Sequence, residues 1–264
     1  MGVAPAPPLR PEPEPPAPPE VALPEAGRQE GRLGKVFRAT EELNRRAVLA
    51  ALEPRPGCAL LDIGPHRGEF TARVAERLRA GSVAGVELIA DHIPEARARG
   101  IDVVQADVDA DGLPFAEASF DVVHANQVIE HVRRTDRFMS EIRRVLVPGG
   151  VAVVSTNNIA SWHNIFSLVL GYQPMPQHVS DEVILGNPLN PLHGDLHEDL
   201  GRSHLRLFTA RALAELAAHH GLEPVEVGAS GYYPLTGAPA RLAARRDPRH
   251  AAFLVAVLRR PDGL

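Results

Sequence analysis

Segments with helical spacing of apolar residues alternate with short apolar runs along most of this chain. Residues 35–52 repeat apolar side chains such as Val36, Leu43 and Leu52 at helical spacing and predict a helix. Residues 58–64 are almost continuously apolar, as in a strand that is covered on both faces. The alternation continues and predicts helices at 70–81, 91–100, 137–150 and 209–222, and strands at 82–88, 101–107, 120–126, 151–157, 225–233 and 251–260.

Five of these strands alternate with helices within about 100 residues, which indicates a parallel sheet because parallel neighbours need crossover connections. We therefore expect a doubly wound, Rossmann-like α/β domain over residues 31–264. The pattern breaks at about 159–207, where Gly, Pro, His and Asn separate short apolar runs, so a cap insertion is predicted after the fifth strand. Pro148, Gly149 and Gly150 are expected to end the helix before that strand.

Residues 1–30 have a different composition, in which Pro alternates with Ala and Glu. Such a segment neither forms helix hydrogen bonds nor buries apolar area, so a disordered or polyproline-like tail is predicted. A proline-rich recognition peptide is the alternative, although PxxP spacing is hard to avoid in this composition.

Charge and cysteine content narrow the classes of partner. The formal net charge is −5 and no long basic run occurs, so we expect no nucleic-acid partner. Cys58 is the only cysteine, which suits a reducing compartment, and the cytoplasm is the expected location. No apolar run reaches the length of a transmembrane helix.

The candidate ligand site lies where the predicted strands end. The first strand delivers Asp62 and then Gly64 and Gly68 into a helix, and ligands of open α/β sheets bind at such ends. A dinucleotide fingerprint would read G-x-G-x-x-G, whereas here a carboxylate precedes G-x-x-x-G, which repels pyrophosphate and suits an ammonium group. Glu87 ends the second strand and could bind ribose hydroxyls, and Asp107 follows the third and could accept from an adenine amine. Each acid alone can be a solvated loop charge, but the set describes a site for an aminoacyl nucleoside.

These segments resemble the class I S-adenosylmethionine-dependent methyltransferases, in particular the methyltransferase type 11 branch that includes ubiquinone-biosynthesis enzymes. The resemblance covers about residues 35–264 and rests on the segments 60–70, 85–88, 105–132 and 138–158. It implies a seven-stranded, mostly parallel sheet whose last strand is antiparallel, and S-adenosylmethionine as the cofactor. It further implies the following contacts: Asp62, Gly64 and Gly68 line the methionine half, Glu87 holds the ribose, Asp107 and the backbone of Val108 hold adenine, and Asn126 lies near the methionine part.

His66 departs from the family pattern, because it follows Pro65 where relatives most often have glycine. One interpretation is that the loop tolerates histidine at position 66 in place of glycine. Weakened cofactor binding is the other, and it would make the chain a noncatalytic binding or interaction protein. A nucleotide-cofactor oxidoreductase is a third hypothesis, which Asp62 disfavours.

The predicted reaction is methyl transfer to a small-molecule acceptor at an oxygen or carbon atom. A hydroxyl nucleophile benefits from a general base, and the insertion supplies five candidates: His163, His178, His193, His197 and His204. His204 is our first candidate, because the run 203–209 resembles the family segment that closes over the site. His131 is interpreted as a packing or hydrogen-bonding residue.

The insertion raises two further hypotheses. His193 and His197 are four residues apart and could bind a metal with Asp195 and Glu198, but nearby Pro and Gly disfavour a regular helix, so we assign no metal site. The apolar segment 165–176 predicts a lid, with peripheral membrane contact as an open alternative.

The fourth strand ends in His-Ala-Asn-Gln-Val rather than in the motif of amino-methyltransferases that act on bases. The oligomeric state is not predicted.

Overall fold

The computed structural model describes residues 32–180, 182–194 and 204–263. The predicted tail at residues 1–30 lies outside them. Strand β1 (Ala59–Ile63) and its neighbours form one seven-stranded sheet in the order β3-β2-β1-β4-β5-β7-β6. The other strands are β2 (Ser82–Glu87), β3 (Asp102–Gln105), β4 (Phe120–Asn126), β5 (Leu146–Asn157), β6 (Glu223–Ser230) and β7 (Phe253–Arg259).

Strands β1 to β5 pair in parallel, and β7 runs antiparallel to both β5 and β6. The predicted doubly wound, mostly parallel sheet with an antiparallel last strand is therefore confirmed. The described α-helices are α1 (Arg32–Ala51), α2 (Glu69–Leu78), α3 (Ile93–Ala98), α4 (Thr135–Val145), α5 (Trp162–Val169), α6 (Ala210–His219) and α7 (Gly237–Arg246). Three short 3₁₀-helices accompany them, namely η1 (Ala90–His92), η2 (Ile129–His131) and η3 (Pro248–His250).

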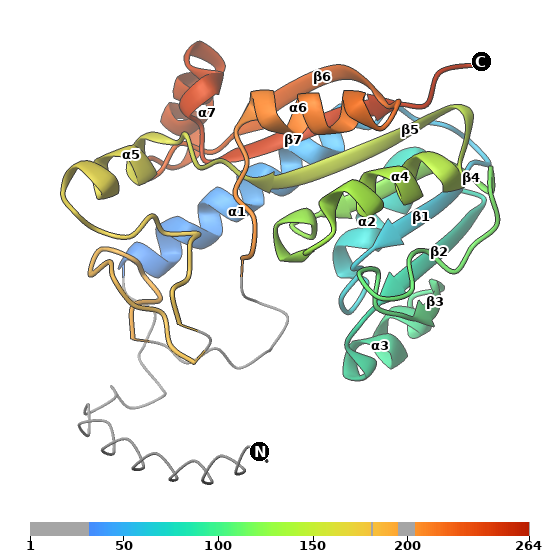
Figure 1. Ribbon diagram of the computed structural model, residues 1–264, viewed down its shortest axis with the longest axis horizontal. Helices are drawn as coiled ribbons and strands as arrows, with labels where there is room; N and C mark the ends of the chain where they lie inside the picture. The colour runs from blue at the N-terminus through green and yellow to red at the C-terminus, as the bar shows by residue number, and fades with distance from the viewer. Residues whose placement is uncertain (1–31, 181, 195–203, 264) are drawn as a thin grey trace, which may run out of the picture.

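Helices cover both faces of the sheet (Figure 1). On one face, Val48 of α1 and Val74 of α2 pack against alternate strand residues such as Leu60. On the other face, Met139 of α4 and Leu213 of α6 complete the larger core. Alternate strand residues enter the two cores because successive side chains of a strand point to opposite faces.

Two predictions about the elements were wrong. Helix α4 ends at Val145 instead of continuing to Gly150, because Leu146 turns to extended backbone and pairs with Phe120 of β4. The Pro-Gly-Gly segment therefore belongs to β5. Helix α7 was not predicted, and its buried side chains are only Ala240 and Ala244, a weak apolar signal.

In the described residues 159–180 and 182–194, the predicted cap insertion contains α5 and otherwise forms turns without regular helix or strand. Trp162 at the start of α5 donates from its ring N–H to Asp247, 2.8 Å away, which joins the cap to the segment after α7. In the part of the chain that the structure describes, no helix is long and apolar enough to cross a bilayer.

Candidate functional site

The loop between β1 and α2 has the backbone shape that its glycines predict. Gly64 and Gly68 have φ angles of 75° and 85°, which favour glycine. A Cβ on Gly64 would lie 2.8 Å from Val128 Cγ2, and one on Gly68 would lie 2.7 Å from Ile101 Cδ1. Space and conformation both require glycine at these two positions.

His66 also lies in the left-handed region, with φ 53°. Histidine adopts this conformation more readily than most side chains do. The His66 ring packs against the ring of His92, with centroids 3.8 Å apart. Burial, and then the nearby His92, lower the pKa of His66, which favours the neutral ring. The loop thus keeps a glycine-like backbone conformation at His66.

Asp62 is buried at the end of β1, and both of its carboxylate oxygens are engaged. The Thr71 hydroxyl of α2 donates to Oδ2 over 2.5 Å, and His124 Nδ1 of β4 lies 2.8 Å from Oδ1. Asp62 therefore ties β1, β4 and α2 together beneath the loop. Sequence reasoning missed Thr71 and His124, and the parallel register that places His124 beside Asp62 is a tertiary feature.

Glu87 connects the ends of two strands. Its Oε2 accepts the main-chain N–H of His66 over 2.8 Å, and its Oε1 accepts that of Ile89 over 2.9 Å. The carboxylate after β2 thus lies directly against the loop after β1. Each oxygen keeps a second lone pair for a ligand hydroxyl.

The remaining predicted cofactor residues lie beyond the ends of β3 and β4. Asp107 accepts the main-chain N–H of Asp109 over 2.8 Å, and Val108 is half-buried beside it. Asn126 ends β4, and its Oδ1 accepts from Asn44 Nδ2 over 3.0 Å. The cofactor roles of Asp107, Val108 and Asn126 stay predictions.

Asn44 of α1 is a polar centre that the sequence did not reveal. It is buried, and besides donating to Asn126 its Oδ1 accepts from the hydroxyls of Ser155 and Ser230, over 3.0 and 3.3 Å. A polar residue at the edge of an otherwise apolar helix face is the only local signal. The network joins α1 to the ends of β4, β5 and β6.

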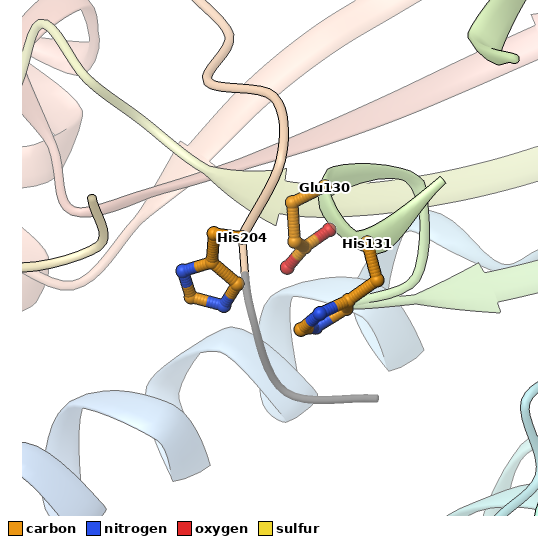
Figure 2. A group of neighbouring side chains, drawn as sticks. All are labelled: Glu130, His131 and His204. Atoms are coloured by element: carbon orange, nitrogen blue, oxygen red, sulfur yellow. The ribbon is translucent and has the colours of Figure 1, made fainter. Parts of the chain in front are cut away.

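A second group of side chains lies beyond the ends of β4 and β5. Figure 2 shows Glu130, His131 and His204 side by side, and the ring centroids of the two histidines are 4.7 Å apart. One ligand atom from each of the three residues lies within 4.8 Å of the other two. His204 was the predicted catalytic residue, whereas Glu130 was missed despite its place next to His131.

Backbone contacts bring the distant His204 to this group. The main-chain N–H groups of Leu205 and Arg206 donate to the carbonyl oxygen of Glu130, over 2.7 and 3.1 Å. His204 Nδ1 lies 2.6 Å from the carbonyl oxygen of Pro176. A carbonyl oxygen only accepts, so Nδ1 carries the hydrogen, and Nε2 holds a lone pair in the neutral ring.

Glu130 is fully buried, with neutral hydrogen-bond partners. Thr156 Oγ1 donates to its Oε2 over 2.9 Å, and Asn157 Nδ2 donates to its Oε1 over 3.3 Å. Burial raises the pKa of Glu130 to about 7, against the lowering effect of these hydrogen bonds.

Of the other candidate bases, His178 lies next to this group, whereas His163 lies apart from it. The ring of His178 stacks on that of His204 with centroids 5.0 Å apart. His163 faces Tyr233 instead, and burial lowers its pKa to about 4. His193 is exposed, while His197 lies outside the described residues, as do Asp195 and Glu198 of the weighed metal set.

The predicted lid segment, residues 165–176, exposes several apolar side chains of its first half. Phe166, Leu168, Val169 and Leu170 each expose more than half of their side chains.

A separate polar cluster of Asp136, His219 and His220 lies on the surface between α4 and α6, where His220 Nε2 is 2.9 Å from Asp136 Oδ1.

Comparisons with known proteins point to one family. Residues 61–154 match the methyltransferase domain family. A demethylmenaquinone methyltransferase of Beutenbergia cavernae is 33% identical over 122 residues, which cover 46% of this chain and 50% of that protein. The biotin biosynthesis bifunctional protein BioHC of Cellvibrio japonicus is 41% identical over 103 residues, covering 37% of this chain and 19% of that protein. The chain thus spans half or less of the length of these two relatives.

Solved structures share the fold over more of the chain. A S-adenosylmethionine-dependent methyltransferase from Mesorhizobium loti superposes with a TM-score of 0.56 at 21% identity, covering 81% of this chain and 96% of that chain. A chain from the complex between the Haloferax volcanii Trm112 methyltransferase activator and a putative methyltransferase superposes with the same TM-score at 16% identity. The match covers 86% of this chain and 94% of that chain. At these identities the likeness concerns the fold alone.

Proposed function

We propose that this chain, which carries a class I S-adenosylmethionine-dependent methyltransferase domain, transfers the methyl group of S-adenosylmethionine to a small-molecule acceptor. One observation supports this most directly: Glu87 holds the loop that contains His66 through a 2.8 Å hydrogen bond. The loop after β1 and the carboxylate that ends β2 thus lie side by side, which supports a ligand site at this edge, as expected in open α/β sheets.

In this proposal the cofactor lies along the carboxyl ends of β1 to β4. Asp62, Gly64 and Gly68 line the methionine half, where the two glycines let the backbone approach the ligand. Glu87 accepts from the ribose hydroxyls, Asp107 and the backbone of Val108 hold adenine, and Asn126 lies near the methionine part.

The acceptor is bound beyond β4 and β5, next to His204. Its oxygen or carbon atom attacks the sulfonium methyl group, so the S–CH₃ bond breaks as the new bond to the acceptor forms. S-adenosylhomocysteine and a proton are released. The donor is already activated, so alignment of the two substrates supplies much of the rate. His204 is the proposed catalytic residue, with Nε2 as its working atom.

The alternatives are less well supported. The noncatalytic hypothesis rested on His66, but the left-handed backbone there preserves the loop shape that glycine would provide. Asp62 at the base of the loop disfavours a dinucleotide pyrophosphate and so an oxidoreductase. We propose the cytoplasm as the location, because the single cysteine suits a reducing compartment.

Calorimetric titration of the full chain with S-adenosylmethionine, S-adenosylhomocysteine and NAD⁺ tests the proposal. We expect binding of the first two and none of NAD⁺. Phenols, quinols and hydroxylated metabolites are then screened for methylation, and His204→Ala should reduce turnover about 100-fold without changing S-adenosylhomocysteine affinity. Absence of S-adenosylhomocysteine binding would refute the function, and binding without turnover of any acceptor class would favour the noncatalytic alternative.

A further inference from the structure

The group of Glu130, His131 and His204 combines two imidazoles with one carboxylate. These are the donors that zinc and related divalent ions take in open, catalytic sites. The donors come from two parts of the chain, η2 at the end of β4 and the segment before α6, which the backbone contacts of Glu130 hold together. The cluster is therefore assembled by the tertiary fold.

His204 presents the correct atom for such a role. Because Nδ1 is bound to the carbonyl oxygen of Pro176 over 2.6 Å, Nε2 is the ring atom through which His204 would bind an ion. Metal-binding histidines commonly donate their other ring N–H to a carbonyl or carboxylate, which fixes the ring orientation. His204 has this supporting contact before any ion is bound.

Glu130 supplies the charge. Its carboxyl group is buried, and none of the described lysines and arginines forms an ion pair with it. Thr156 and Asn157 orient its two oxygens through neutral hydrogen bonds, as partners of a ligating carboxylate do. A buried carboxylate with neutral partners is favoured by a nearby cation, because the cation offsets the cost of removing the charge from water.

We propose that Glu130, His131 and His204 form a binding site for a divalent transition-metal ion of the zinc type. The nitrogen-rich donor set favours zinc or iron over magnesium and calcium, which prefer oxygen ligands. Tetrahedral coordination at about 2.1 Å places donors roughly 3.4 Å apart, so small side-chain rotations suffice to close the present spacing of up to 4.8 Å. Three protein ligands leave a position open for water or an acceptor oxygen.

The link to catalysis rests on the proposed function: an ion here would lie on the acceptor side and bind an acceptor oxygen. With the ion bound, Nε2 of His204 would be its ligand, whereas the role of Nε2 as a base in the proposed function applies to the chain without the ion. Binding of the ion itself is independent of methyl transfer, so the two proposals can fail separately.

The test uses the full chain after treatment with EDTA and dialysis. Zn²⁺ is titrated by calorimetry, Co²⁺ is followed by its visible absorption, and Mg²⁺ is titrated in parallel. The variants are His131→Ala, His204→Ala and Glu130→Gln, with thermal melting as the check on folding. His219→Ala is the matched control, since it removes a histidine from the exposed cluster with Asp136 and His220.

We expect one Zn²⁺ per chain, weak Mg²⁺ binding, and a Co²⁺ spectrum typical of four- or five-coordination. His204→Ala and His131→Ala should each weaken Zn²⁺ binding at least about 100-fold, and His219→Ala should leave it unchanged. Thr156→Val, which removes a hydrogen bond to Glu130 but no ligand, should weaken it about 10- to 100-fold.

The proposal is overturned if Zn²⁺ does not bind, if folded His204→Ala binds it as wild type does, or if His219→Ala abolishes the site. S-adenosylhomocysteine is titrated on the same samples. Retained S-adenosylhomocysteine binding without Zn²⁺ binding would refute only the metal site, and the converse would refute only the methyltransferase function.

Discussion

Glu87 Oε2 accepts the main-chain N–H of His66 over 2.8 Å, so the carboxylate that ends β2 also holds the loop that follows β1. Its other oxygen accepts the N–H of Ile89. A single side chain thus couples the shape of the glycine-containing loop to the proposed ribose contact. One side chain thus supports the loop and makes the proposed ribose contact. Thermal melting reports on the first role, and calorimetry with the ligand reports on the second.

Glu87→Ala should weaken S-adenosylhomocysteine binding by about 1–3 kcal/mol, or roughly 5- to 150-fold in Kd, because a buried acceptor of several hydrogen bonds is lost. Calorimetry on the variant provides the measurement, and thermal melting reports the loss of loop support. Glu76→Ala, an exposed acid on α2, is the control and should bind as wild type does. If the Glu87 variant binds S-adenosylhomocysteine as tightly as wild type does, Glu87 is not part of the cofactor site.

His66→Gly should change S-adenosylhomocysteine affinity by less than about 1 kcal/mol. The variant loses the ring contact with His92, and the unfolded chain gains freedom, but the left-handed backbone at φ 53° becomes unstrained. Gly68→Ala provides the contrast, because its new Cβ would lie 2.7 Å from Ile101 Cδ1 at φ 85° and should lower the melting temperature clearly. A tenfold or larger loss in His66→Gly would show that the ring itself contacts the cofactor.

His163 should lower the free energy of unfolding as the pH is lowered from about 6.5 to 4, against the opposite contribution of Glu130, whose raised pKa favours the folded state as the pH falls. Burial lowers the folded-state pKa of this ring to about 4, whereas the unfolded chain binds the proton near the ordinary value of 6.5. Below pH 6.5 the unfolded state therefore holds more protons, and stability present above that pH is lost, by about 3 kcal/mol in total. Urea unfolding at pH 7 and pH 4.5 measures the change.

His163→Asn should show a smaller loss of stability over the same pH interval, since it cannot take up the proton. The comparison is made between the two slopes and not between absolute stabilities, because the substitution also alters the contacts with Ser161 and Tyr233. Identical pH dependence in both proteins would rule out His163 as the cause.

Asn44→Ala should destabilise the fold by about 2–3 kcal/mol. The change removes the partner of Asn126, Ser155 and Ser230 in a buried setting and leaves their polar groups unsatisfied. Urea unfolding gives the magnitude, with Arg45→Ala on the exposed side of α1 as the control. A loss no greater than that of the control would mean that water replaces Asn44 at little cost.

Local patterns were sufficient for the sheet and the cofactor loop. The almost continuously apolar run at residues 58–64 predicted a buried strand, because a strand covered on both faces presents few side chains to water. The left-handed turns at Gly64 and Gly68 were readable because only glycine adopts them without strain beside a packed strand end. These features depend on neighbours a few residues apart.

Tertiary structure alone decided which distant side chains meet. Glu130 and His204 are far apart in the chain, and their proximity follows from the hydrogen bonds of Leu205 and Arg206 to the Glu130 carbonyl. Asn44 reaches the ends of β4 to β6 only because α1 packs across that face of the sheet. No local periodicity encodes such contacts. The strands, the loop and the acids at the strand ends can be predicted from neighbouring residues, whereas their partners are brought close only by packing of the whole domain.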